Sequence, residues 1–279
     1  MHDMESRRLE KRLKERFVKA MATYQLIEDD DRILVGLSGG KDSLLLTELL
    51  AKRALIRHPR FSVEALHVRM ENIHYESDTG YLEQFCADLG VPLHIAATRF
   101  DTATPHSEAT AAEAVPSEAV PSKTSAVKYT ATVPQSPAAL RRQKQPCFLC
   151  SWNRRKQLFN LAQALGCNKI ALGHHQDDII HTALMNLTFQ GRFGTMPARL
   201  KMRKMPITLI RPLCMIEEAD IKAYAALRGY EKQKKRCPYE SDSHRSDIRQ
   251  LYTAIEHINP EARHSIWRAL NEANKMIEE

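Results

Sequence analysis

Apolar strand-like segments alternate with helical segments along most of the chain, and this alternation most restricts the folds available to it. Strands are predicted at Arg32–Leu37, Phe61–Arg69, Pro92–Ala97, Lys169–Leu172 and Ile207–Ile210. Helices are predicted between and after them, at Ser43–Arg57, Asp78–Leu89, Asn153–Leu165 and Asp177–Phe189. Strands joined through helices run parallel, so the sequence predicts an α/β fold with a doubly wound parallel sheet and flanking helices.

The rest of the chain divides into three further parts. Residues 1–30 are predicted to form an amphipathic helix, with apolar side chains at helical spacing among charged ones. The main domain is predicted over 31–279, with basic C-terminal helices from about 214, at Glu217–Leu227, Ser246–Glu256 and Glu261–Ile277. Residues 101–139 are mostly Ala, Thr, Ser, Pro, Glu and Val, so they are predicted to be a disordered insertion.

The composition favours polyanionic partners and argues against a membrane protein. Lys and Arg outnumber Asp and Glu by 41 to 34, which gives a net charge of +7. No apolar run approaches the roughly 20 residues that span a bilayer, and the charged N-terminal segment lacks the apolar region of a secretory signal. A cytoplasmic protein without a membrane partner is therefore expected.

The hexapeptide SGGKDS, from Ser38 to Ser43, lies between the first predicted strand and the first predicted helix. Gly39 and Gly40 allow the backbone to approach an anion closely, and the helix that follows directs its positive end to the same place. Lys41 supplies a charge, Ser38 and Ser43 supply hydroxyl donors, and Asp42 is suited to phosphate only through a bridging Mg²⁺. The segment is not a Walker A loop, because G-x-x-x-x-G-K-[ST] does not occur in the chain. It predicts a polyphosphate-binding loop.

A second polar segment, GHHQDD, begins at Gly173 and also joins a predicted strand to a helix. One interpretation of Asp177 and Asp178 is that they only cap the helix and complement its dipole. Beside a phosphate loop, they are predicted to hold Mg²⁺ on ATP, with His174 next to the nucleotide.

Three cysteines are candidates for metal chemistry. Cys147 and Cys150 form a C-x-x-C pair before a predicted helix, and Cys237 follows a basic run. Disulfides are not expected in a reducing compartment, and spacing alone leaves open a zinc site or an iron–sulfur cluster. The remaining three cysteines, Cys86, Cys167 and Cys214, are predicted to be packing residues.

The two polar segments together resemble those of the N-type ATP pyrophosphatases, which carry a PP-loop and cleave ATP between its α and β phosphates. The order of further features is similar to the tRNA 2-thiocytidine synthetases: the C-x-x-C pair, then GHHQDD, then Met196-Pro197, then Arg211-Pro212-Leu213 and a late cysteine. Departures are Ala198 after Met196-Pro197, the single late cysteine, and the long insertion before Cys147.

The resemblance implies a function and a set of cofactors. It implies a [4Fe–4S] cluster held by Cys147, Cys150 and Cys237, and an ATP- and Mg²⁺-dependent adenylation of C2 of an anticodon-loop cytidine at position 32. Sulfur, supplied by a cysteine desulfurase or another donor, then replaces the oxygen, and lysine and arginine groups near the cysteines contact the tRNA. A homodimer is also expected. Three alternatives remain open: a uridine thiolase, a lysidine synthetase that needs no cysteines, and a zinc-stabilised RNA-binding protein.

Overall fold

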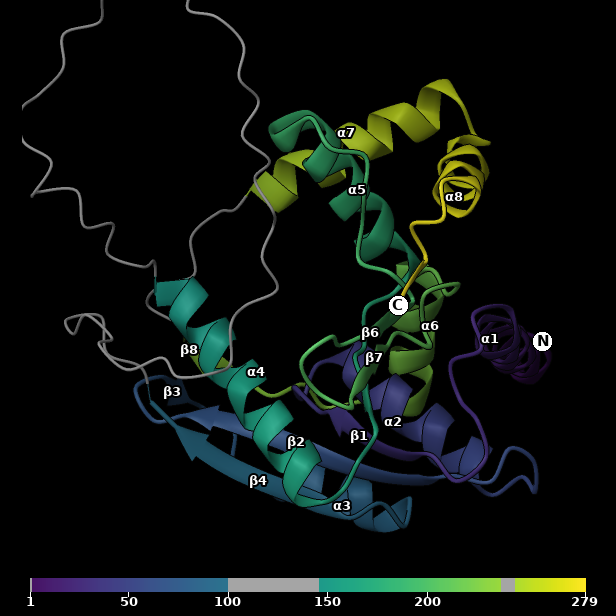
Figure 1. Cartoon of the computed structure of the whole chain (residues 1–279). Helices are drawn as coiled ribbons and strands as arrows, with labels where there is room; N and C mark the ends of the chain where they lie inside the picture. Colours follow the sequence, from purple (N-terminus) through teal and green to yellow (C-terminus); the bar gives the residue numbers. More distant parts are fainter. Residues whose placement is uncertain (1, 100–145, 237–243) are drawn as a thin grey trace, which may run out of the picture.

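A seven-stranded sheet forms the centre of the molecule (Figure 1). This computed structural model describes residues 2–99, 146–236 and 244–279. In spatial order, the strands are β4 (Leu93–Thr98), β2 (Ser62–Met70), β1 (Arg32–Gly36), β5 (Lys169–Ala171), β7 (Thr208–Ile210), β6 (Arg199–Lys201) and β9 (Ile277–Glu278). The five strands from β4 to β7 are parallel, and β6 and β9, which are parallel to each other, run in the opposite direction. The predicted doubly wound sheet is confirmed.

Two hydrophobic cores lie on opposite faces of this sheet. Successive side chains of a strand point to opposite faces, so Ile33 and Val35 of β1 enter one core while Leu34 enters the other. The first core is closed by α1 (His2–Thr23), α2 (Lys41–Ala54), α3 (Gly80–Asp88) and α6 (Glu218–Arg228). The second is closed by α4 (Pro146–Ala164). The apolar stripe of the N-terminal helix is buried in the first core at Leu13, Phe17, Met21 and Tyr24.

Several helix boundaries differ from the prediction, and the N-terminal helix ends at Thr23 instead of residue 30. Helix α4 begins at Pro146 instead of Asn153, because proline needs no hydrogen-bonded N–H in the first turn and its φ already suits a helix. The C-x-x-C pair therefore lies inside the first turn of α4. The last helix, α8 (Ala262–Glu272), ends before the predicted Ile277, since Asn274 takes a positive φ of 54° and the chain then enters β9.

The C-terminal helices and a small ribbon complete the described structure. Helices α5 (Gln176–Gln190), α7 (His244–Ile258) and α8 pack together beyond the sheet (Figure 1). The ribbon pairs β3 (His74–Tyr75) with β8 (Lys235–Arg236) and was not predicted. None of the helices in the described ranges has the length and apolar character needed to cross a bilayer. The expected disordered insertion at 101–139 and Cys237 lie outside the described residues.

Candidate functional site

The loop between β1 and α2 depends on a glycine at position 39. Gly39 has a φ of +79°, in the left-handed region that L side chains rarely adopt. A Cβ atom here would lie 2.2 Å from Gln233 Cγ and 2.7 Å from Gln233 Cβ. The Gln233 backbone N–H also donates to the Gly39 carbonyl oxygen at 3.0 Å. The loop is thus pinned against the segment that leads into β8.

Serine hydroxyls fix the shape of the same loop from inside. Ser43 Oγ donates to the Gly40 carbonyl oxygen at 2.9 Å and accepts the Ser38 backbone N–H at 3.1 Å. The hydroxyls of Ser38 and Ser43 lie 3.1 Å apart. Ser43 is buried, whereas Ser38 is exposed at the mouth of the loop. Of the two predicted phosphate-binding hydroxyls, Ser38 faces outward and Ser43 shapes the backbone.

Helices α2 and α5, which both start at this edge of the sheet, differ in their capping. Helix α5 has a capping box, in which His175 Nδ1 accepts the Asp178 N–H and the Asp178 carboxylate accepts the His175 N–H. Helix α2 begins after Gly40, and no side chain of the described residues caps it. The first N–H groups of a helix need acceptors, and together with the helix dipole they attract anions. The uncapped start of α2 therefore has the free N–H groups that an anion such as phosphate needs.

Lys41 is held at the start of α2 by two carboxylates. Its Nζ lies 3.0 Å from Asp42 Oδ1 and 3.1 Å from Glu218 Oε1 of α6. Burial acts to lower the pKa of Lys41, but the charges and hydrogen bonds of Asp42 and Glu218 outweigh it and raise the pKa. Glu218 responds in the opposite sense: burial alone would raise its pKa, and hydrogen bonds from Lys41 and Lys222 lower it to about 2. The ammonium group stays charged beside the loop.

The second polar segment contacts the loop directly. A Cβ atom on Gly173 would come within 3.1 Å of the Asp42 carbonyl carbon and the Ser43 nitrogen, so a larger residue here would push the start of α2 away from β5. His175 Nε2 lies 3.4 Å from Asp178 Oδ2 and 3.9 Å from Asp42 Oδ1. Burial opposes protonation of His175, but its hydrogen bond with Asp177 and the nearby carboxylate charges raise its pKa.

Asp42 and Asp178 have the chemistry of a magnesium site on a nucleotide. Asp42 Oδ1 is buried and accepts no hydrogen bond from the described residues, although the Lys41 ammonium lies 3.0 Å away. Mg²⁺ is usually held by one or two carboxylates together with substrate phosphates. In the described ranges, no group of three or more His, Cys, Asp or Glu side chains is arranged to hold a metal without such help. The residues present fit a Mg²⁺ that arrives with ATP.

Asp177, the neighbouring carboxylate, is fully engaged by the protein. Its Oδ2 accepts the Glu218 backbone N–H at 2.7 Å, and its Oδ1 accepts a hydrogen bond from Arg263 of α8 at 2.9 Å. Burial alone would raise the pKa of Asp177, but hydrogen bonds from His175, Arg263 and the Glu218 backbone hold it well below its usual range. The side chain joins the starts of α5 and α6 to the C-terminal helices.

His174 is a neutral imidazole beside a buried arginine. Arg211 Nε donates to His174 Nδ1 at 3.2 Å, and Arg211 also donates to the Pro197 carbonyl oxygen. Burial first, and then the charges of Arg211, Arg245 and Arg155, lower the pKa of His174 to about 3.

The C-x-x-C pair lies at the same edge of the sheet as the loop. Helix α4 is followed by β5, which is parallel to β1, so its first turn starts at the carboxyl edge of the strands. Cys147 is exposed and Cys150 half-buried, and no disulfide joins the described cysteines. Arg154, one turn after Cys150, donates to the Tyr75 hydroxyl of β3, which is paired with β8. Two thiols three residues apart share a helix face near its positive end, which suits thiolate ligands.

The other described cysteines are buried packing residues, as predicted. Cys86 and Cys214 lie in the first core and Cys167 in the second. Burial raises the pKa of the Cys86 thiol to about 11 and that of the Cys214 thiol further still.

Several residues of the site were missed by sequence reasoning. Glu218 and Arg263 enter it from α6 and α8, and nothing in their local sequence distinguishes them from other charged helix residues. His67 of β2 is buried; its Nδ1 lies 2.8 Å from the Leu37 carbonyl oxygen, and its Nε2 has no hydrogen-bond partner among the described residues. Its position three residues before the end of a strand next to the loop was the one available signal.

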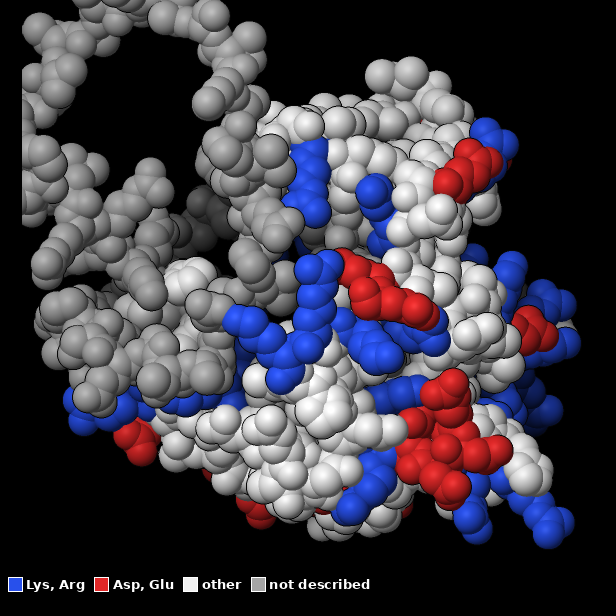
Figure 2. All heavy atoms as spheres, in the orientation of Figure 1, with Lys and Arg blue, Asp and Glu red and all other residues white. Residues whose placement is uncertain are grey.

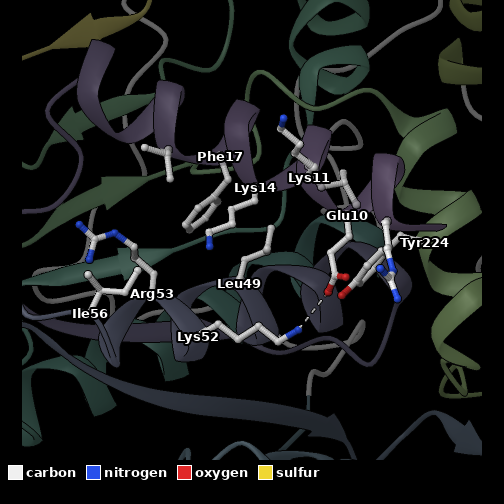
Figure 3. Close-up of a pocket in the computed structure, with 12 residues that line it drawn as sticks. Glu10, Lys11, Lys14, Phe17, Leu49, Lys52, Arg53, Ile56 and Tyr224 are labelled. Carbon is white, nitrogen blue, oxygen red and sulfur yellow. Dashed lines mark ion pairs between the residues drawn. The ribbon is translucent and has the colours of Figure 1, made fainter. Parts of the chain in front are cut away.

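Away from the phosphate loop, a cavity lies between α1, the second half of α2 and α6 (Figure 3). It has a volume of about 420 Å³ and is lined by residues that include Phe17, Leu49 and Tyr224. At a rise of about 1.5 Å per residue, Leu49 is roughly 12 Å along α2 from Lys41. The cavity is therefore separate from the phosphate loop.

The fold and the loop together define a PP-loop ATP-binding protein. A family model described as a PP-loop domain matches residues 6–116. The chain belongs to the family of the tRNA-cytidine(32) 2-sulfurtransferases. It is 30% identical over 264 residues to the protein of that name from Pseudomonas syringae pv. tomato, and the match covers 94% of this chain and 84% of that protein.

Other relatives agree in name but are longer. The tRNA-cytidine(32) 2-sulfurtransferase of Bordetella avium is 34% identical over 226 residues, a match that covers 81% of this chain and 61% of that protein. The chain thus spans about three fifths of the length of several of the curated relatives it matches. Among solved structures, the U34-tRNA thiolase NcsA from Methanococcus maripaludis, described with its [4Fe-4S] cluster, has a TM-score of 0.66 and 22% identity, over 98% of this chain and 81% of that one. This likeness concerns the fold.

Proposed function

We propose that the protein is an ATP-dependent tRNA sulfurtransferase that converts an anticodon-loop cytidine, at position 32, to 2-thiocytidine. One observation carries the proposal: the uncapped start of α2, the charged Lys41 beside it and the thiols in the first turn of α4 all lie at the same edge of one sheet. The relatives of the chain bear the name of this activity.

The first step uses the loop and the second polar segment. The N–H groups at the start of α2 and the Lys41 ammonium bind the phosphates of ATP, and Asp42 and Asp178 would hold the accompanying Mg²⁺, which neutralises phosphate charge when bound. The C2 carbonyl oxygen of cytidine attacks the α-phosphorus, and pyrophosphate leaves. The fixed donors stabilise the negative charge that develops on the phosphate oxygens, which is the main contribution a protein makes to such transfers.

The second step needs a sulfur nucleophile near the activated base. A sulfur atom attacks C2, the C–O bond breaks, and AMP leaves with the former carbonyl oxygen. Cys147, Cys150 and Cys237 would hold a [4Fe–4S] cluster, which would supply a binding place for sulfur when present. We assign the supply of sulfur to a cysteine desulfurase or another donor. Basic side chains on the face between α4 and α5, visible in Figure 2 with acidic groups beside them, suit contact with the tRNA backbone.

The test combines metal analysis with nucleoside analysis. The protein is purified without oxygen, assayed for iron, sulfide and zinc, and incubated with ATP, Mg²⁺, sulfide and a tRNA transcript. We expect about four irons per chain and 2-thiocytidine at position 32, with pyrophosphate released. Cys147→Ser should lose both the iron and the thiolation, whereas Cys86→Ser, in the buried core, should keep both. Stoichiometric zinc, or a thiolated uridine in place of cytidine, would refute the proposal.

A further inference from the structure

A small cavity lies between α5 and α7, directly beside the second polar segment. Its volume is about 110 Å³. Pockets that hold drug-sized molecules or whole nucleotides usually measure about 300 to 1,000 Å³, so this one has room for a single ring and little more. Its walls include Asp178 and Thr182 from α5 and Ile248 from α7.

Two residues of the cavity wall connect it to the phosphate loop through neighbouring side chains. Asp178 lies on its wall, and the same carboxylate is 3.4 Å from His175 Nε2, which is 3.9 Å from Asp42 of the loop. Arg249, on the opposite wall, lies 3.9 Å from Glu218, the partner of Lys41. A ring held in the cavity would therefore lie next to the phosphates that Lys41 binds.

The lining combines apolar surfaces for a flat ring with polar groups for its edge. Met185, Met196 and Ile248 are the apolar part. His174 contributes a donor of known direction: because a guanidinium nitrogen only donates, His174 Nδ1 accepts from Arg211 and the ring hydrogen is on Nε2. The Thr182 hydroxyl donates or accepts. This is the chemistry that reads the edge of an extruded base and packs against its faces.

The rim of the cavity carries positive charge. Arg245 and Arg249 follow each other by one turn on α7, so they share a helix face, and both side chains are exposed. The phosphates on either side of an extruded nucleotide lie next to the base pocket, and cations at the rim of the pocket can bind them.

We propose that this cavity receives the pyrimidine base that is modified, turned out of its stack, while Arg245 and Arg249 bind the flanking phosphates. The inference rests on the proposed function, because it names the place where the base of that reaction is bound. The Asp177–Arg263 pair and the buried Tyr252, whose ring meets His181 edge to face, hold α7 in position to form the outer wall.

The decisive variant fills the cavity. Thr182→Met adds volume inside it, and Thr188→Met makes the same change at an exposed site on α5, outside the cavity. Each protein is titrated with a tRNA that carries the fluorescent analogue pyrrolocytidine at the target position, and thiolation is measured with unmodified tRNA. Thr182→Met should reduce thiolation at least about tenfold and abolish the fluorescence change, with ATP affinity kept within about twofold. Thr188→Met should behave as the wild type.

A second variant guards against a folding defect at Thr182. Arg245→Ala removes an exposed side chain, so the variant should fold normally. It should bind tRNA more weakly, and the slope of the logarithm of the binding constant against the logarithm of salt concentration should fall by about one. Arg268→Ala, at an exposed site on α8, is its control.

The outcomes separate the two proposals. Unchanged thiolation in Thr182→Met, a loss of ATP affinity in that variant, or unchanged tRNA binding in Arg245→Ala each overturns the base pocket. The reaction and the pocket can also fail separately. If the wild-type protein changes the fluorescence of the analogue, Thr182→Met abolishes that change, and no 2-thiocytidine forms, the pocket is supported and the proposed reaction is refuted.

Discussion

Asp177 of α5 and Arg263 of α8 are joined by an ion pair of 2.9 Å in which both side chains are largely buried. The same carboxylate accepts the Glu218 backbone N–H, so one side chain connects the starts of two helices at the site with the C-terminal helices. Arg263 also lies over the ring of Tyr252 on α7, at 5.6 Å from its centroid. The position of α7 and α8 over the site thus depends on this pair.

Replacing Asp177 with asparagine should destabilise the protein substantially. The change leaves the buried guanidinium of Arg263 without its principal counter-charge, which typically costs about 3 kcal/mol. Urea unfolding at pH 7 measures the difference in free energy of unfolding. Glu272→Gln breaks the exposed ion pair of Arg268 on the same helix and should change stability by less than about 0.5 kcal/mol. Equal effects of the two variants would contradict the assigned role of Asp177.

Lys41 should be needed for the nucleotide step and much less for folding. Lys41→Met removes the charge beside the start of α2, so pyrophosphate release should fall about a hundredfold, as when one fixed donor is removed from a transition state. Lys11→Met, at a site whose side chain is 77% exposed on α1, provides the control. Pyrophosphate is measured in the presence of tRNA. Comparable rates in the two variants would exclude Lys41 from this step.

Gly39→Ala and Gly90→Ala separate a steric clash from backbone strain. Both glycines have positive φ, +79° and +66°, but a Cβ at Gly39 would collide with Gln233 whereas nothing lies within 4 Å of one at Gly90. Gly90→Ala should therefore cost only the left-handed strain of about 1 kcal/mol. Gly39→Ala should cost more and also weaken ATP binding, which calorimetric titration detects. An equal loss of stability in both variants, with ATP affinity unchanged, would argue against a pinned loop.

The neutral state of His174 should appear in the pH dependence of stability. Its folded-state pKa of about 3 lies below the unfolded value near 6.5, so the unfolded chain binds the proton first. Stability is thus full above pH 6.5 and falls with pH, by about 1.5 kcal/mol from this group between pH 6.5 and 5.0.

His174→Asn isolates this contribution. Asparagine can still accept from Arg211 but does not titrate, so the difference in unfolding free energy between wild type and variant should shrink by that amount over the same range. A constant difference would mean that the pKa of His174 is the same in the folded and the unfolded protein.

The parts of the site that follow one another in the chain were predictable, and those joined across the fold were not. SGGKDS and GHHQDD each place a strand end, a turn and a helix start within six residues, so local rules identify them. Contacts such as Lys41–Glu218 and Asp177–Arg263 link positions far apart in the sequence. From the sequence alone, many other charged residues were equally good candidates for these partners. The β3–β8 ribbon was missed for a related reason: two-residue strands carry no periodic pattern.

Gln233 ties the nucleotide loop to the strand that precedes Cys237. It donates its backbone N–H to Gly39, while its side chain bonds to Ser77 and Asp78 before α3. The backbone of Gly39 and the strand that leads to Cys237 are therefore only three residues apart through Gln233, so a shift of the loop would reach Arg236 over a short, hydrogen-bonded path.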